Sequence, residues 1–224
     1  MMQNIEPSED RPWTLLEKEN MFIGISGLIG AGKTTLATEL GKVMGLPVYY
    51  EPVIDNVYLS DFYKDPKKYS FNLQIYLLNV RFKQHQQIIW NAKGGVQDRT
   101  IYEDSVFAKV LRDSELMEER DYRTYISLFT NMSNFMKKNT LIVHLDVTPE
   151  ESLERIKLRS RDMETTITID YLRSLHSAYD SFLKDISKQI PVIRVNYSQF
   201  KTAEQMARVV YEEYSKLNIT TFIN

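Results

Sequence analysis

The stretch GLIGAGKT, residues 27–34, has the residue types and spacing that hold a chain of phosphates. It fits the pattern G-x-x-x-x-G-K-[ST] at every fixed position. Glycines let backbone N–H groups approach phosphate oxygens, and the N-terminus of the helix that should follow adds partial positive charge. Lys33 would reach the β- and γ-phosphates, and the Thr34 hydroxyl would be a ligand of Mg²⁺. The alternative is a glycine-rich turn with an incidental lysine, which the strand before the motif and the helix after it disfavour.

The residues expected at the triphosphate are those of the loop and the one that follows it. They are Gly27, Leu28, Ile29, Gly30, Ala31, Gly32, Lys33, Thr34 and Thr35. This narrows the ligand to ATP or GTP without naming a reaction. Phosphoryl transfer needs a metal ion, cations for the developing charge and a group that orients the acceptor, so the rest of the chain has to supply them.

Two acidic residues lie where strands are expected to end: Glu51 closes LPVYYE and Asp98 closes GGVQD. If both strands flank the first strand, both carboxylates face the phosphate loop. Glu51 could then take a proton from an attacking hydroxyl, and Asp98 could hold Mg²⁺ directly or through water. The planar guanidinium of Arg99 would suit a transferring phosphoryl group. The alternative is that each acid caps the next helix, although Pro52 weakens that reading for Glu51.

Three arginines fall within seven residues of RIKLRSRDME: Arg155, Arg159 and Arg161. Guanidinium groups that converge near a triphosphate would neutralise charge in the transition state, as the arginines of a lid do. The alternative is a solvated basic helix end that complements the helix dipole.

Short apolar runs typical of strands alternate with longer helical patterns along the chain. Strands are expected at 21–26, 46–51, 94–98, 140–147 and 191–197. Helices are expected at 34–45, 70–92, 101–112, 119–138, 149–159, 168–188 and 201–217. This alternation predicts a doubly wound α/β fold, with a five-stranded parallel sheet and helices on both faces. Functional residues should then lie just after the strands.

Composition bounds the remaining possibilities. The 224 residues carry a net charge of −2, so no overall field favours nucleic acid, and no apolar run approaches the ~20 residues of a membrane helix. The absence of cysteine excludes disulfides, thiolate zinc sites and cysteine nucleophiles. Residues 1–19 lack the apolar region of a signal peptide and are expected to be a flexible tail before a single domain at 20–224. The cytoplasm is the expected location, with the nucleus not excluded.

The chain resembles the deoxynucleoside kinases in a combination of motifs. These are the phosphate loop, EPV, the glutamine near the start of the long helix, DRT and R-x-x-x-R-x-R. The resemblance runs from Met21 to the last helix. DRT followed by YEDSVF is especially similar to deoxyadenosine and deoxyguanosine kinases of bacterial type. The resemblance implies a P-loop kinase fold with an arginine-rich lid, ATP as phosphoryl donor, Mg²⁺, and a homodimer formed through two long helices.

The resemblance also implies roles for individual residues. It makes Glu51 the general base at the nucleoside 5′-hydroxyl, with Arg99 nearby. It assigns Gln74 to paired hydrogen bonds with the base, which one acceptor and two donors on a short side chain allow. It places Tyr63 and Glu164 at the 3′-hydroxyl of the sugar.

Arg81 and Asp104 fall where the deoxycytidine and deoxyguanosine types of the family have an Arg–Asp pair over the base. Thymidine-preferring members lack that pair, so thymidine is not expected as the main substrate. Gln74 and Arg81 are seven residues apart, so they share one face of the expected helix. The alternative is an exposed arginine on an amphipathic helix.

The expected activity is ATP-dependent phosphorylation of the 5′-hydroxyl of a deoxynucleoside, with deoxyadenosine or deoxyguanosine as substrate. The alternatives are a nucleoside monophosphate kinase of thymidylate kinase type and a deoxycytidine-preferring kinase. Glu51 argues against the former, because a carboxylate would repel the phosphate of a monophosphate acceptor. A GTP-driven switch is disfavoured because D-x-x-G and N-K-x-D are absent. A binding module without catalysis would leave Glu51, Asp98, Arg99 and the arginine cluster unexplained.

Overall fold

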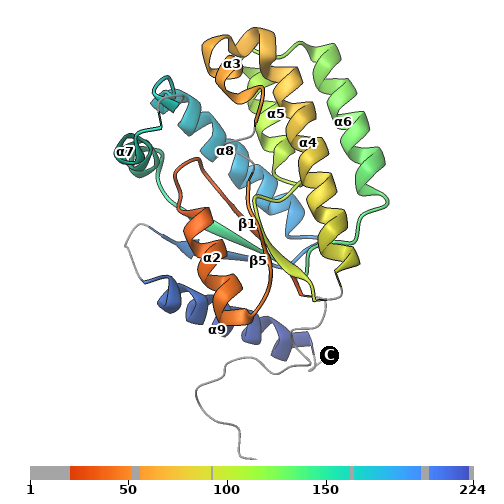
Figure 1. Cartoon of the computed structure of the whole chain (residues 1–224), viewed down its shortest axis with the longest axis vertical. Helices are drawn as coiled ribbons and strands as arrows, with labels where there is room; N and C mark the ends of the chain where they lie inside the picture. Colours follow the sequence, from red (N-terminus) through yellow and green to blue (C-terminus); the bar gives the residue numbers. More distant parts are fainter. Residues whose placement is uncertain (1–20, 52–55, 92, 162–163, 198–201, 222–224) are drawn as a thin grey trace, which may run out of the picture.

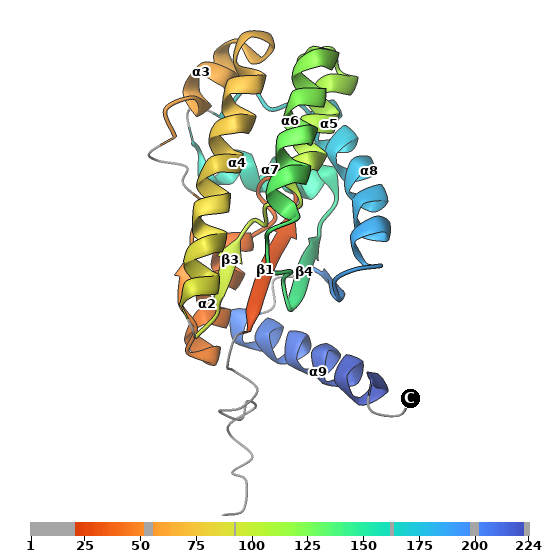
Figure 2. The same ribbon diagram turned by 90° about the vertical axis from the view of Figure 1, so that its right-hand side faces the viewer.

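The computed structural model of the chain describes residues 21–51, 56–91, 93–161, 164–197 and 202–221. The expected tail at 1–19 lies outside the described residues. Figures 1 and 2 show the described chain as a central sheet surrounded by helices.

Five strands form one sheet, in the order β2-β3-β1-β4-β5. They are β1 (Phe22–Gly27), β2 (Val48–Tyr49), β3 (Gly95–Asp98), β4 (Leu141–Asp146) and β5 (Val192–Asn196). Every neighbouring pair is parallel, as the right-handed crossovers of a doubly wound fold require. The predicted fold class is therefore confirmed.

Of the two strands that end near Glu51 and Asp98, only β3 flanks β1, because β3 lies between β2 and β1. β2 is also short, ending at Tyr49 instead of Glu51. The carbonyl of Tyr50 accepts a hydrogen bond from Gln84 Nε2 on the next long helix, at 2.8 Å, so the chain leaves the sheet at this point. Glu51 still follows the carboxyl end of a strand, and it therefore lies at the same edge of the sheet as Asp98.

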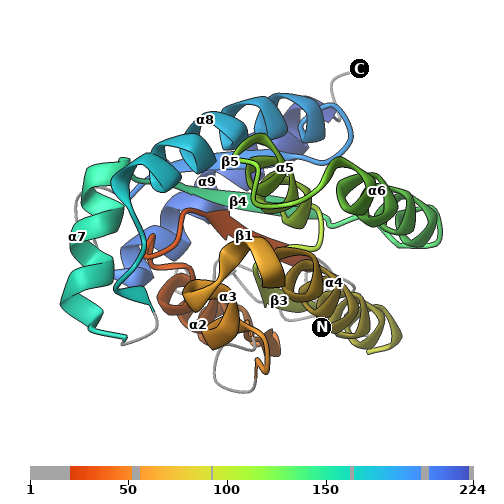
Figure 3. The same ribbon diagram turned by 90° about the horizontal axis from the view of Figure 1, so that it is seen from above.

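Eight helices surround the sheet in the described part of the chain. They are α2 (Lys33–Met44), α3 (Leu59–Lys64), α4 (Pro66–Trp90), α5 (Asp104–Asp113), α6 (Glu119–Ser133), α7 (Pro149–Arg159), α8 (Ile169–Ile186) and α9 (Ala203–Thr221). Seen from above, α2 and α9 lie on one side of the sheet and α4, α5, α6 and α8 on the other (Figure 3). Helices on both faces were predicted, and the structure has them.

The helix boundaries differ from the predictions in two places that matter for the site. The long helix α4 begins at Pro66, where Asp65 accepts a bond from the backbone N–H of Lys68, at 3.2 Å. Proline at the first helical position and an aspartate cap explain this earlier start. The short helix α3 before it was not predicted, and it carries Tyr63.

Candidate active site

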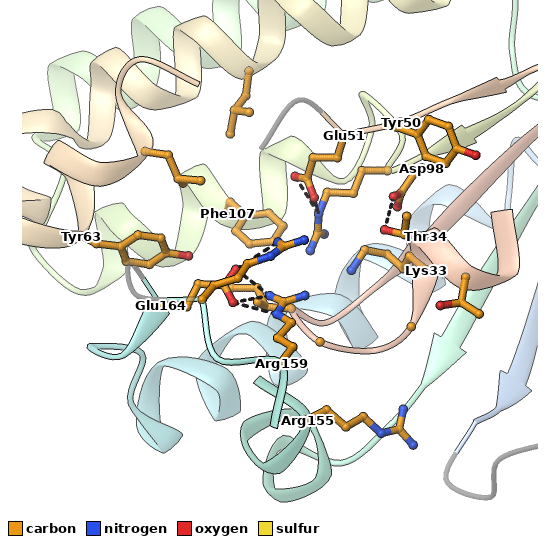
Figure 4. A pocket seen from close by; sticks show the side chains of 18 of the residues that line it. Lys33, Thr34, Tyr50, Glu51, Tyr63, Asp98, Phe107, Arg155, Arg159 and Glu164 are labelled. Carbon is orange, nitrogen blue, oxygen red and sulfur yellow. Dashed lines mark hydrogen bonds and ion pairs between the residues drawn. The ribbon is translucent and has the colours of Figure 1, made fainter. Parts of the chain in front are cut away.

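A cavity of about 1030 Å³ opens at the carboxyl edge of the sheet, where ligands of doubly wound folds bind. The phosphate loop lines one side, α3 and α4 line another, and the segment after α7 lines a third (Figure 4). Residues from distant parts of the sequence therefore face one space, which is large enough for two small substrates.

The phosphate loop has the backbone that its glycines predict. Gly30 and Gly32 have φ of 80° and 94°, a region that side chains disfavour. A Cβ on Gly32 would also lie 2.8 Å from the ring of Tyr197. Leu28 and Ala31 have side chains buried in the core, so only their backbone could face a ligand. Ile29, Thr35 and the remaining loop residues after Gly27 line the cavity or lead into it.

Lys33 is buried at the base of this loop, where its Nζ donates to the carbonyl of Leu28 at 2.6 Å. Burial, followed by the positive charge of Arg99, lowers the pKa of Lys33 to about 7. A bound anion would stabilise the charged form of this ammonium group. The lysine is therefore suited to phosphate oxygens and is poorly satisfied without them.

Thr34 and Asp98 lie together, with the threonine hydroxyl donating to Asp98 Oδ2 at 2.6 Å. The other carboxylate oxygen, Oδ1, is buried and has no hydrogen-bond partner in the described part of the chain. Burial, followed by the charge of Glu51, raises the pKa of Asp98. An unpartnered carboxylate beside a hydroxyl fits a hard cation such as Mg²⁺, which takes one or two protein ligands and completes its shell with water and phosphate. Among the described residues no group of three or more acids or histidines could bind a metal alone.

Glu51 is held between two arginines. Arg81 donates to its Oε1 at 2.7 Å, and Arg99 donates through Nε to its Oε2 at 3.1 Å. Burial alone would raise the pKa of Glu51, but Arg99 and then Arg81 outweigh it and lower the pKa to about 2. The carboxylate is consequently ionised at neutral pH and can accept a proton or a hydrogen bond.

Gln74 and Arg81 share the inner face of α4, as their spacing predicted, and both line the cavity. Gln74 is 2% exposed, and its Oε1 has no partner among the described residues. A buried amide oxygen without a partner is costly, so a ligand atom that donates to it would be favoured. Arg81 is also 2% exposed, so the alternative of an exposed arginine is wrong.

Asp104, at the start of α5, forms an ion pair with Arg81. Arg81 belongs to the described residues that line the cavity, and Asp104 does not. The expected pair therefore exists, but the arginine faces the cavity and the aspartate supports it from behind. This order follows from burial, since Asp104 is 1% exposed and α5 packs against α4.

Tyr63 and Glu164 line one end of the cavity, where the hydroxyl of Tyr63 points toward Glu164 (Figure 4). Burial, and then the charges of nearby groups that include Glu164, raise the pKa of Tyr63 far above its ordinary value. The phenol of Tyr63 therefore remains a hydrogen-bond donor at neutral pH, and the side-chain oxygens of Glu164 beside it can accept hydrogen bonds. This combination can hold one sugar hydroxyl.

The three arginines of the expected cluster all line the cavity, but their guanidinium groups have different partners in this structure. Arg159 donates to Glu164 at 2.8 and 2.6 Å, and Arg161 approaches the same carboxylate at 3.5 Å. Arg155 instead donates to the carbonyls of Tyr197 and Ala31, at 2.7 and 3.3 Å. Figure 4 shows it pointing away from Arg159. The reason is that main-chain oxygens after β5 and in the phosphate loop hold Arg155, whereas Glu164 attracts the other two.

Three aromatic residues complete the wall of the cavity. Phe107 of α5, which the family resemblance makes a candidate for an apolar clamp on the substrate, packs its ring 4.9 Å from the guanidinium carbon of Arg99. Tyr171 and Tyr197 were not assigned a role from the sequence, because aromatic residues are common in cores and no local signal distinguished them. No helix in the described ranges has the length and apolar character needed to cross a bilayer.

Comparison with known proteins agrees with this geometry. Residues 23–218 match the family model "Deoxynucleoside kinase". The chain is 63% identical over 206 residues to deoxyadenosine kinase of Dictyostelium discoideum, covering 92% of this chain and 84% of that protein. It is 34% identical over 212 residues to deoxyadenosine/deoxycytidine kinase of Bacillus subtilis, covering 88% and 97% respectively.

A solved structure of deoxyadenosine kinase from M. mycoides, with the products dCMP and a flexible dCDP bound, has the same architecture. It superposes with a TM-score of 0.79 at 32% identity, covering 88% of this chain and 100% of that one. Sequence and fold therefore agree, and the chain belongs to the deoxynucleoside kinase family.

Proposed function

We propose that this deoxynucleoside kinase transfers the γ-phosphoryl group of ATP to the 5′-hydroxyl of deoxyadenosine. The 63% identity with a deoxyadenosine kinase, over 92% of the chain, carries the choice of base. The buried amide of Gln74 supports it, because one glutamine can accept from the amino group of adenine and donate to a ring nitrogen.

On the acceptor side, Glu51 takes the proton of the 5′-hydroxyl. Its low pKa makes it a weak base while Arg99 and Arg81 contact it. A loose transition state for phosphoryl transfer needs little activation of the nucleophile, so an oriented weak base is sufficient. A hydroxyl that replaces part of the contact with Arg99 would also raise the pKa of this carboxyl.

On the donor side, the phosphate loop and Lys33 bind the triphosphate, and Arg99 stabilises charge on the transferred group. Thr34 and Asp98 hold Mg²⁺, which when bound neutralises the β- and γ-phosphates. Arg159 and Arg161 approach the triphosphate from the lid. Arg155 contributes to the ATP site through its bonds beside Tyr197 and the phosphate loop.

At the sugar, Tyr63 donates to the 3′-hydroxyl and Glu164 accepts from it. A 2′-hydroxyl would crowd the tyrosine ring, which favours deoxyribose. Arg81, which Asp104 holds in place, lies with Gln74 at the proposed site of the nucleobase. If Tyr63→Phe leaves both the affinity and the preference for deoxyribose unchanged, this part of the proposal is wrong.

Deoxycytidine is a second candidate substrate. The Bacillus subtilis relative is named for both deoxyadenosine and deoxycytidine, and the M. mycoides enzyme was solved with dCMP. Cytosine carries an amino donor next to a ring acceptor, so the same glutamine amide can pair with it. We rank it second because the relative at 63% identity is named for deoxyadenosine alone.

The test is a steady-state assay with ATP, Mg²⁺ and each of the four deoxynucleosides, followed by the monophosphates. Deoxyadenosine should give the highest kcat/KM, deoxycytidine the next, and thymidine the lowest. Glu51→Gln should keep ATP binding and lose ~10²–10⁴-fold in kcat. Glu204→Gln, on the exposed face of α9, is the matched control and should be fully active. Thymidine as the best nucleoside, or turnover with monophosphates alone, would contradict the proposal.

We also propose a homodimer in which α4 and α6 of two copies pack together. The two helices lie side by side on the outside of the molecule (Figures 1 and 2). Ile75 and Phe82 of α4 and Ile126 of α6 pack against the chain's own core and remain partly exposed, and Leu128 of α6 is among the exposed large apolar side chains. Sedimentation equilibrium should give twice the chain mass, and Leu128→Glu, at a position that is 40% exposed, should shift it toward the monomer. A monomer at micromolar concentration would refute this arrangement.

A further inference from the structure

Glu103 is a completely buried carboxylate that lies in the turn before α5, outside the set of residues that line the cavity in the described chain. Its Oε1 accepts from the backbone N–H of Thr100 at 3.1 Å, and its own N–H donates to the Thr100 hydroxyl at 3.3 Å. This is the reciprocal pattern of a capping box, and T-x-x-E in the sequence is its signature. It fixes the turn that directly follows Arg99.

The second oxygen of Glu103 gathers donors from separate elements. Oε2 accepts from the hydroxyl of Tyr179 on α8 at 2.6 Å and from the hydroxyl of Ser26 on β1 at 2.9 Å. It also lies 3.4 Å from the backbone N of Gly27, the first residue of the phosphate loop, and 3.5 Å from Nη1 of Arg99. One oxygen atom thus contacts the phosphate loop, the proposed catalytic arginine and α8, a helix much later in the sequence.

Arg99 depends on this surrounding structure for its position. Its φ is 71°, in the left-handed region that non-glycine residues adopt only when their surroundings hold them there. Nη1 donates to the carbonyl of Gly27 at 3.1 Å and to the Tyr179 hydroxyl at 3.2 Å. Nε donates to Glu51 on the other side. The guanidinium therefore lies between two carboxylates, one in the cavity and one behind it.

Glu51 and Glu103 both compensate the positive charge of the buried Arg99 guanidinium. A buried guanidinium with Glu51 as its sole counter-charge would hold that carboxylate tightly and compete with an acceptor hydroxyl for it. Glu103 provides a second negative charge that does not face the cavity. The ion pair between Glu51 and Arg99 is then weaker, so that Glu51 can exchange part of this contact for one with the substrate.

We infer that Glu103 is a positioning residue for phosphoryl transfer, which holds Arg99 and the start of the phosphate loop in one fixed arrangement without touching either substrate. The inference rests on the role proposed above for Arg99. A disturbed network would displace the guanidinium and the loop relative to each other, and such displacements lower the rate of transfer more than they weaken binding.

The test replaces Glu103 with glutamine, which keeps the shape and the acceptor for Thr100 but turns an amide donor or a neutral oxygen toward the Oε2 partners. We expect kcat to fall about 10- to 100-fold, with the KM for deoxyadenosine changed by less than about threefold, because the base site is untouched. Tyr179→Phe removes one partner and should give a smaller loss in the same direction. Val110 lies in the core on α5, the helix that follows Glu103. Val110→Ala is therefore the control for destabilisation and should leave kcat unchanged per folded molecule.

A double-mutant cycle with Arg99→Lys separates positioning from general stability. In the Arg99→Lys background, Glu103→Gln should lower kcat by a clearly smaller factor than in the parent protein, because one of the two groups that it positions is gone and only its contact with Gly27 of the phosphate loop remains to be lost. If Arg99→Lys has full activity, the proposed role of Arg99 fails. If Arg99→Lys is impaired but Glu103→Gln is fully active, or if the two losses multiply, the positioning role is overturned. Should Glu103→Gln not fold, the same cycle with Tyr179→Phe gives the answer.

Discussion

The ion pair between Arg81 and Asp104 makes a stability prediction that can be worked from the structure. Arg81→Met removes a guanidinium that is 2% exposed and leaves Asp104, which is 1% exposed, with a buried charge. Breaking a buried pair by removing one partner costs about 3–5 kcal/mol. Glu51 also loses Arg81, but it is 24% exposed and keeps Arg99 at 3.1 Å. We therefore expect most of the loss to come from the aspartate.

The matched double variant is Arg81→Met with Asp104→Leu, which replaces the pair with apolar side chains. Because the uncompensated charge is then gone, it should recover most of the stability that Arg81→Met loses. Urea unfolding followed by circular dichroism at pH 7 measures all four members of this cycle. If the two single losses add in the double variant, the two groups are not coupled and the reasoning is refuted.

The pH dependence of the same variant checks the cause. Burial already raises the pKa of Asp104 to about 6 in the parent protein, although Arg81 opposes the rise. Without Arg81 the pKa of this carboxyl rises further, so the native state binds more protons than the unfolded chain until higher pH. Stability then falls as pH rises from the unfolded pKa of ~4 through the raised native value. The deficit of Arg81→Met should be larger at pH 7 than at pH 5, and an equal deficit would indicate a packing defect instead.

Three further predictions concern the binding of each reactant. Affinity for ATP should fall as pH rises through about 7, because the pKa of Lys33 is lowered to that value by burial, and Lys33→Arg should flatten the dependence in a calorimetric titration. Gln74→Leu should lower kcat/KM for deoxyadenosine about 10- to 100-fold and spare the KM for ATP, since an unpaired base loses about 1–3 kcal/mol; an unchanged value would remove the glutamine from the base site. Asp98→Asn should raise the Mg²⁺ concentration for half-maximal activity about tenfold or more, and an unaltered Mg²⁺ titration would exclude it as a ligand.

Local sequence patterns were sufficient to predict most elements of the fold. The strands, the phosphate loop and the long helix each have a signature within a few residues, and the seven-residue spacing placed Gln74 and Arg81 on one face of α4. The order of the strands has no such signature, because it depends on which chain segments pack across the sheet. That is why the sequence left the neighbours of β1 open, and the structure places β3 beside β1 and β2 at the edge of the sheet.

Side-chain direction was harder to predict than position. Arg155 and Arg159 are one helical turn apart, yet their guanidinium groups have different partners, at Tyr197 just after β5 and at Glu164. The network of Glu103 shows the same limit. Glu103 was not singled out from the sequence, and the residue that makes its shortest hydrogen bond, Tyr179, is 76 residues away in the chain.

The acids of this site differ in their electrostatics even though they lie close together. Glu51 has its pKa lowered to about 2 because two arginines outweigh its burial, whereas burial prevails at Asp98 and raises its pKa. The first acid is thus ionised and available for the acceptor role proposed above, and the second gains most from a cation beside its unpartnered oxygen in the described part of the chain. Since the charge of Arg99 acts on the pKa of both carboxyls, a change that moves Arg99 should impair the proposed acceptor side and donor side together. This links the proposed catalytic roles to the positioning role of Glu103, because both depend on where one guanidinium lies.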